Sequence, residues 1–359
     1  MNQTAAMPPL TALLAARARQ LGADDTPDWA RELARQCILD WFAVTIAGAT
    51  EPLVDILVAE AEEQGGRTEA GLVGRRGGFN VGQAALINGA ASHALDYDDV
   101  NLAVLGHPTV AVFPGLLALA AREGKSGRDT VTAFIAGYET ACRIGLAMAP
   151  GHYGAGFHAT STVGCFGAAA ACARLLELDQ ERTEYALGLA GTQAAGLKSM
   201  FGTMAKPFHA GNAANNGLRA ALLARRGFTA RPDVLECAQG FAATQTTTFN
   251  PAAALRAVRR RHVERLLRLD LSPSDDASDR PLERLRAGGQ LADDERAGVA
   301  AGRGPRLCGV REHPGRGGGT VDRTVGIRTG RLDAVVSRDG GAQPADGVHC
   351  LAAAARHAS

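Results

Sequence analysis

The stretch DWARELARQCILDWFAVTIAGAT, residues 28–50, decides the fold class. Its large apolar side chains recur at steps of three and four residues, which is the spacing of one face of an α-helix. The residues with this spacing are Trp29, Leu33, Cys37, Trp41, Phe42 and Ile46. The sequence therefore predicts an amphipathic helix here, with its apolar face toward a core.

Similar apolar runs follow along the chain, separated by Gly and Pro and without the alternating pattern of strands. They are residues 81–95, 110–123, 130–147, 163–178, 181–195 and 213–226. Many of their residues are Ala or Gly, which let helix backbones approach closely in a dense interior. Residues 1–250 are therefore expected to form one mainly α domain.

The composition changes near Asn250, and residues 251–359 contain no Phe, Tyr or Trp. Aromatic side chains supply much of the area that a core buries, so this segment is expected to order poorly. Residues 327–336 alone have the pattern of a short strand pair. A flexible tail is one explanation, and a change of reading frame beyond about Glu264 is another. Resequencing of the locus distinguishes the two.

The net charge, the length of the apolar stretches and the cysteine content exclude several classes of protein. With 38 Lys and Arg against 37 Asp and Glu, the net charge of +1 creates no overall field that attracts nucleic acid or an anionic membrane. No stretch reaches the roughly 18 apolar residues of a membrane span. Seven cysteines without a CxxC pair are typical of a reduced protein. We therefore expect a cytoplasmic protein that binds neither nucleic acid nor membrane.

The common catalytic signatures GxSxG, GxGxxG, HExxH and CxxC are absent. A first polar cluster, HALDYDD at residues 93–99, instead places three carboxylates at the end of a predicted helix, where they oppose its dipole and repel one another. The cluster needs a cation, and the candidates are His107, Lys206 or a metal ion. A metal site here would use His93, Asp96, Asp99 and His107. Their spacing matches no metal motif, so no metal is predicted.

For Asp98 and Asp99 the simpler alternative is that one of them caps a turn and faces water. A second cluster, GHYGAGFHATST at residues 151–162, is a Gly-rich loop that leads into an apolar helix. Its Thr and Ser residues can cap this helix, whose first N–H groups favour an anion. His158 would lie at the helix start, or would alternatively be a core histidine bonded to a carbonyl group.

A third cluster, GTMAKPFHAGNAA at residues 202–214, places Lys206 near another helix start. Lys206 is the only lysine after Lys198, and its ammonium group suits a substrate carboxylate. The simpler alternative is a solvated loop charge. Together the clusters offer helix starts that favour anions, an acidic helix end and imidazoles that move protons near neutral pH. This combination suits a di- or tricarboxylic acid.

These motifs resemble those of the MmgE/PrpD family, which includes 2-methylcitrate dehydratase, cis-aconitate decarboxylase and an iminodisuccinate epimerase. The matching strings are NGAASHALDYDD (88–99), GHPT (106–109), GFHATSTVG (156–164) and KPFHAGNAA (206–214). The resemblance implies a large all-helical domain, a smaller α+β domain, a homodimer and an active site without metal or organic cofactor. It implies that Asp96, His107, His158 and Lys206 are catalytic, and that His93, Thr160, Ser161, His209 and Asn212 bind the substrate. In residues 251–359 only a degenerate remnant of the α+β domain is expected.

The predicted function is therefore that of a lyase that dehydrates a small 2-hydroxy polycarboxylate such as 2-methylcitrate, an acid of propionate metabolism. His158 or Asp96 would be the base, His107 the acid or an orienting group, and Lys206 would hold a carboxylate. The alternatives are decarboxylation or epimerisation of a related acid, since all three reactions pass through a carbanion beside a carboxylate. A catalytically inactive, truncated family member and a metal-dependent hydrolase are the remaining alternatives.

Overall fold

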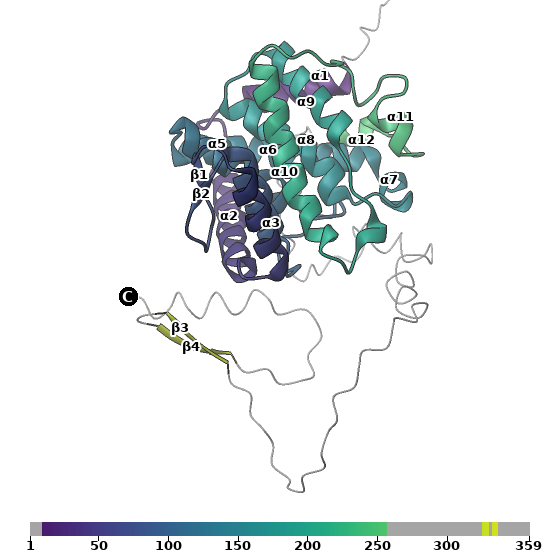
Figure 1. Cartoon of the computed structure of the whole chain (residues 1–359). Coiled ribbons are helices and arrows are strands. Elements are labelled where there is room, and N and C mark those ends of the chain that lie inside the picture. Colours follow the sequence, from purple (N-terminus) through teal and green to yellow (C-terminus); the bar gives the residue numbers. More distant parts are fainter. Residues whose placement is uncertain (1–8, 257–324, 330–331, 337–359) are drawn as a thin grey trace, which may run out of the picture. The chain divides into compact units, whose positions relative to one another are not determined.

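The computed structural model describes residues 9–256, 325–329 and 332–336 (Figure 1). The chain divides into two units, residues 1–271 and 272–359. Helices dominate the described part of the first unit, so the predicted fold class, mainly α, is confirmed. The helices are α1 (Leu10–Gln20), α2 (Asp28–Gly48), α3 (Pro52–Gln64), α4 (Val81–Ser92), α5 (Pro108–Glu123), α6 (Gly127–Met148), α7 (Gly151–Gly154), α8 (Ala159–Leu175), α9 (Gln180–Gln193), α10 (Ala205–Arg225), α11 (Phe241–Gln245) and α12 (Pro251–Arg256).

Three short elements complete the described part of this unit. Strands β1 (Ala70–Gly71) and β2 (Gly78–Phe79) pair antiparallel just before α4, and the 3₁₀ helix η1 (Lys198–Met200) precedes α10. Among the described residues, no single helix is both long and apolar enough to cross a membrane. Helices α2 and α3 meet that criterion only as a pair, with a bend of 87° between them.

Helix α8 forms the centre of this unit and packs against α5, α6, α9 and α10 (Figure 1). Every residue of α8 except Arg174 is buried. A helix that is apolar or small on all sides is expected to be enclosed by other helices. Glycines allow the closest approach, because a Cβ atom on Gly137 of α6 would overlap the carbonyl oxygen of Gly167 in α8.

Helices α4 and α10 also pack at very short range. A Cβ atom on Gly211 would overlap the carbonyl oxygen of Leu86, and one on Gly89 would lie 2.6 Å from the Cα atom of Gly211. The pairing of these two glycines therefore fixes the end of α4 next to the beginning of α10, and it positions the site described below.

Replacing Gly211 by Ala is expected to lower the free energy of unfolding by about 1–3 kcal/mol, because the added methyl group forces α4 and α10 apart. Urea denaturation followed by circular dichroism measures the change. Gly127→Ala is the matched control, since Gly127 is exposed in the first turn of α6 and an added Cβ atom meets nothing within 4 Å. Equal midpoints for the two variants would contradict the close packing of α4 and α10.

Several helices begin earlier than the sequence pattern predicts, and the differences are largest for α8 and α10. Helix α10 begins at Ala205 and not at residue 213, so Pro207 lies in its first turn. Proline is tolerated there because the first N–H groups of a helix have no partner within the helix. As a result, Lys206 lies on the helix itself.

Helix α8 begins at residue 159, and its N-cap residue is His158, which makes no capping hydrogen bond through its side chain. The predicted capping by the Thr and Ser residues 160–162 is therefore wrong. The hydroxyl groups of Ser161 and Thr162 donate to backbone carbonyl groups, which include those of Ala195 and His158.

The described part of the second unit is an antiparallel hairpin of β3 (Val325–Thr329) and β4 (Leu332–Val336), in which Val325 pairs with Val336. The strand pair predicted at residues 327–336 is thus confirmed. The expected α+β remnant, the expected poor order and the change of reading frame beyond Glu264 concern residues outside the described ranges. The predicted domain boundary at residue 250 stays a prediction. Helix α12, just beyond it, packs against α6.

Candidate functional site

Four helix ends meet in one region of the helical unit. His93 follows the last residue of α4, and Lys206 lies in the first turn of α10. His107 and His158 are the N-cap residues of α5 and α8. The ring of His93 lies between the other two, with centroid distances of 4.8 Å to His107 and 5.9 Å to His158. Asp96, His107, His158 and Lys206, which the sequence analysis singles out, therefore lie together.

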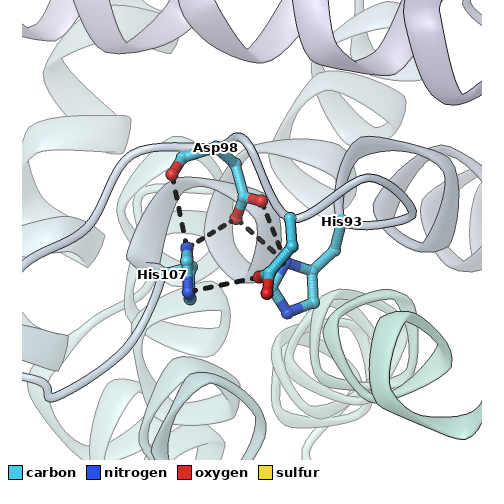
Figure 2. A group of neighbouring side chains, drawn as sticks. His93, Asp98 and His107 are labelled. Carbon is cyan, nitrogen blue, oxygen red and sulfur yellow. Dashed lines mark hydrogen bonds and ion pairs between the residues drawn. The ribbon is translucent and has the colours of Figure 1, made fainter. Parts of the chain in front are cut away.

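Asp98 joins two of the imidazoles (Figure 2). The Nδ1 atom of His93 lies 3.0 Å from both carboxylate oxygens, and the Nδ1 atom of His107 lies 3.0 Å from Oδ2. The side chain of Asp98 is only 1% exposed. Burial alone would raise the pKa of Asp98, but the two imidazoles hold that pKa well below its usual range. Asp98 is therefore ionised at neutral pH.

Asp96 faces the open side of the region and forms an ion pair with Lys206. Its Oδ2 atom lies 2.5 Å from the Nζ atom of Lys206, and its Oδ1 atom lies 3.6 Å from the Nε2 atom of His107. Asp96 has a left-handed backbone, with φ of +58°, and its side chain is 51% exposed. A solvent-accessible carboxylate thus shares its two oxygens between an ammonium group and an imidazole.

The carboxylates around His107 decide its charge. Burial would lower the pKa of His107, but the hydrogen bond and charge of Asp98, with the charges of Asp96 and Asp99, raise it above its ordinary value. His107 therefore retains its proton to a higher pH than an ordinary histidine. It is suited to donate a proton.

The pKa of His158 is shifted in the opposite direction to that of His107. Its Nδ1 atom lies 3.1 Å from the Nδ1 atom of His209, and the side chain is buried. Burial, followed by the charges of His93, His209 and Lys206, lowers the pKa of His158 to about 2. Burial also lowers the pKa of His209. His158 is therefore neutral at neutral pH and a weak base before substrate binds.

The low pKa of His158 predicts a loss of stability in acid. Between the ordinary histidine pKa of 6.5 and the folded pKa of about 2, the unfolded chain binds a proton that the folded protein does not. Stability therefore falls as pH decreases below about 6.5, by at most about 1.4 kcal/mol per pH unit from this one group. Urea denaturation at pH 7 and pH 5 should show that the free energy of unfolding decreases more for the wild type than for His158→Gln. An equal decrease in both proteins would show that His158 does not contribute.

The residues predicted to bind the substrate differ in their hydrogen bonds and in their burial. The hydroxyl oxygen of Thr160 accepts a hydrogen bond from the backbone N–H of His107 at 3.1 Å. The hydroxyl group of Ser161 donates to the carbonyl groups of Ala195 and His209. Asn212 is half-buried on α10, two turns beyond Lys206. Thr160 and Ser161 thus hold the backbone around the site, and the role of all these residues in substrate binding stays a prediction.

Asp98 and Asp99 are both buried, so the alternative in which one of them faces water is wrong. The Oδ2 atom of Asp99 accepts a hydrogen bond from the hydroxyl group of Tyr138 at 3.1 Å. Burial raises the pKa of Asp99 to about 7. The contact of Asp98 with two imidazoles is not predictable from the sequence, because three nearby aspartates offer no local signal that tells them apart.

The residues that could hold a metal ion differ by one from the predicted set. His93, Asp96, Asp98 and His107 each place one potential ligand atom within 4.8 Å of the others, whereas the predicted set contained Asp99 in place of Asp98. Imidazole and carboxylate ligands suit zinc and related ions. However, Lys206 already pairs with Asp96, and Asp98 already contacts both imidazoles. The group is balanced in charge by the protein itself, and the absence of a metal requirement stays a prediction.

Comparison with known proteins identifies the family. A family model described as the MmgE/PrpD N-terminal domain matches residues 12–254. The chain belongs to the MmgE/PrpD family. The matched span contains every residue that the sequence analysis places in the site. The family's N-terminal domain thus corresponds to the helical unit described here.

Curated relatives in this family carry the name cis-aconitate decarboxylase. The chain is 34% identical to an Aspergillus terreus protein of that name over 234 residues, which are 62% of this chain and 47% of the relative. It is 38% identical to the human protein of that name over 165 residues, 45% of this chain and 34% of the relative. It is 31% identical over 254 residues to a cis-aconitate decarboxylase-like protein, oryM, from Aspergillus oryzae, covering 67% of this chain and 52% of the relative. The chain spans about half the length, or less, of these relatives.

Proposed function

We propose that this protein is a lyase that removes a carboxyl group from a small tricarboxylic acid of the cis-aconitate class. One observation carries the proposal. The N-termini of α5, α8 and α10 converge beside Lys206 and His107, and none of these helices has a side-chain cap. Uncapped helix N-termini and cationic side chains together favour a multiply charged anion. The names of the relatives support decarboxylation of such an acid.

In the proposed mechanism, Lys206 moves from Asp96 to a substrate carboxylate. The bond between the substrate carbon and a second carboxyl group breaks, carbon dioxide leaves, and the electron pair stays on the carbon, conjugated with the neighbouring carboxylate. The ammonium group of Lys206 and the helix N-termini stabilise this enolate-like charge. His107 then delivers its proton to the carbon. The carboxylate of Asp96, 3.6 Å from the Nε2 atom of His107, orients the ring through its charge.

Decarboxylation suits these residues better than the predicted dehydration of 2-methylcitrate. Dehydration begins with removal of a proton beside a carboxylate, which needs a base. His158, with its pKa of about 2, is a weak base in the free protein, and Asp96 is already paired with Lys206. Decarboxylation needs no base before carbon dioxide leaves. The dehydration of 2-methylcitrate therefore becomes the second candidate.

A product assay with the full chain tests the proposal. The purified protein is incubated separately with cis-aconitate, 2-methylcitrate and iminodisuccinate, and the products are identified by proton NMR. We expect carbon dioxide release from cis-aconitate. Conversion of 2-methylcitrate alone would instead support dehydration, and the absence of any product would support the inactive family member. Size-exclusion chromatography with light scattering on the same sample tests the predicted homodimer.

Removal of metal ions is expected to leave the activity unchanged, because Lys206 and the protonated ring of His107 already offset the charges of Asp96 and Asp98. Activity is measured before and after dialysis against EDTA, and the metal content is measured by mass spectrometry. A loss of activity that zinc restores would contradict this expectation and would favour the metal-dependent alternative.

A further inference from the structure

Asp98 is the residue of the site to which no role is yet assigned, although it contacts two imidazoles at once. We propose that Asp98 is a positioning residue that fixes the tautomers of His93 and His107, and so keeps both Nε2 atoms available for a substrate. The effect of Asp98 on catalysis rests on the proposed lyase activity. The effect of Asp98 on the tautomers does not, because a tautomer is observed without any substrate.

The tautomers follow from the nature of hydrogen-bond donors and acceptors. An ionised carboxylate has no hydrogen to donate and only accepts. Each Nδ1 atom that lies 3.0 Å from Asp98 must therefore carry a hydrogen, whether its ring is neutral or cationic. A neutral ring with a hydrogen on Nδ1 has a lone pair on Nε2. Asp98 thus sets the orientation and the hydrogen placement of two rings, one from the end of α4 and one from the beginning of α5. It acts on both rings through its carboxylate, and on His107 also through its backbone carbonyl oxygen, which lies 3.3 Å from Nδ1.

The two Nε2 atoms are then available at the site. The Nε2 atom of His107 lies 3.6 Å from the exposed carboxylate of Asp96. The Nε2 atom of His93 is buried and has no hydrogen-bond partner among the described residues. Buried polar atoms are nearly always paired, so an unpaired one indicates a position that a ligand or water occupies. We assign the Nε2 atom of His93 as a contact for a polar group of the substrate.

Replacing Asp98 by Asn separates this role from a merely structural one. The Asn side chain has almost the same shape, but only one of its two terminal atoms accepts a hydrogen bond, whereas the other donates. The donating NH₂ group favours a ring that presents an Nδ1 lone pair. The backbone carbonyl oxygen of residue 98 still accepts from the Nδ1 atom of His107 in this variant. We therefore expect His93 to move its hydrogen to Nε2, while His107 retains its hydrogen on Nδ1.

The test is long-range ¹⁵N–¹H NMR of the full chain labelled on the histidine rings, near neutral pH. The signals of the two rings are assigned from the spectra of His93→Gln and His107→Gln. In the wild type, we expect a hydrogen on the Nδ1 atom of both rings. In Asp98→Asn, we expect His93 to become the Nε2–H tautomer. Asp99→Asn is the matched control, since Asp99 is the adjacent buried aspartate but contacts Tyr138, and both rings should keep their tautomers.

The wild-type spectrum alone can overturn the proposal, so it stays testable even where Asp98→Asn does not fold. A neutral Nε2–H tautomer of either His93 or His107 in the wild type would refute it. Unchanged tautomers in a folded Asp98→Asn variant would refute it equally.

Kinetics test the functional part. Asp98→Asn is expected to lower kcat by at least about 100-fold, while KM changes by less than about threefold, because misplaced hydrogens affect proton transfer more than binding. An unchanged kcat in an active chain would remove the positioning role. Should the wild type convert none of the three acids, the proposed function fails, whereas the NMR result still decides the tautomers.

Discussion

Replacing Lys206 by Met is expected to lower kcat/KM for cis-aconitate by at least about 100-fold, the usual scale for losing one group that stabilises transition-state charge. Met retains most of the length of the side chain and removes its charge, so the change isolates the ammonium group. Without it, neither the substrate carboxylate nor the enolate-like intermediate has its nearest cation. Steady-state kinetics measure the loss, and circular dichroism confirms that the variant folds.

Lys198→Met is the matched control. Lys198 lies on η1 close to α10, but its Nζ atom contacts the carbonyl oxygen and the ring of Tyr153 and not a carboxylate of the site. Its replacement should change kcat/KM by less than about threefold, which is within the range of a charge that does not contact the substrate. Similar losses in both variants would point to a general electrostatic effect and would contradict the proposed role of Lys206.

Replacing His107 by Gln is expected to lower kcat by at least about 100-fold, because Gln fills a similar space but delivers no proton. The pH profile provides a sharper test. The pKa of His107 is raised above its ordinary value, so the wild type keeps its acid protonated through neutral pH and loses activity as pH rises through this raised pKa. The residual activity of His107→Gln should lack this alkaline decrease.

Two outcomes would contradict the role of His107 as the acid. In one, the variant keeps the alkaline decrease at the same pH as the wild type, which would place the acid on another residue. In the other, the wild type gains activity as pH rises, which would mean that the reaction needs a deprotonated group. Profiles of kcat and of kcat/KM between pH 5 and 9 distinguish these results.

The periodic spacing of apolar residues predicted most of the long helices, because burial of one face is a local property of the sequence, but it did not predict α1 or α3. The helix predicted at residues 28–50 occurs as α2, Asp28–Gly48. The spacing failed at the beginnings of α8 and α10, where polar and proline residues form the first turn. Those turns are held by contacts with other segments, such as the bond from Ser161 to the carbonyl group of Ala195, which no local pattern reveals.

The sequence by itself determined that the chain is mainly helical, and it singled out Asp96, His107, His158 and Lys206 as chemically unusual. Only the tertiary structure decided the charge and partner of each of them. The pKa of a side chain depends on burial and on nearby charges, and these come from helices that are distant in sequence. The close packing of α4 on α10 is what places Lys206 on Asp96, 110 residues away along the chain. For the same reason Asp98 and Asp99, neighbours in sequence, face different partners.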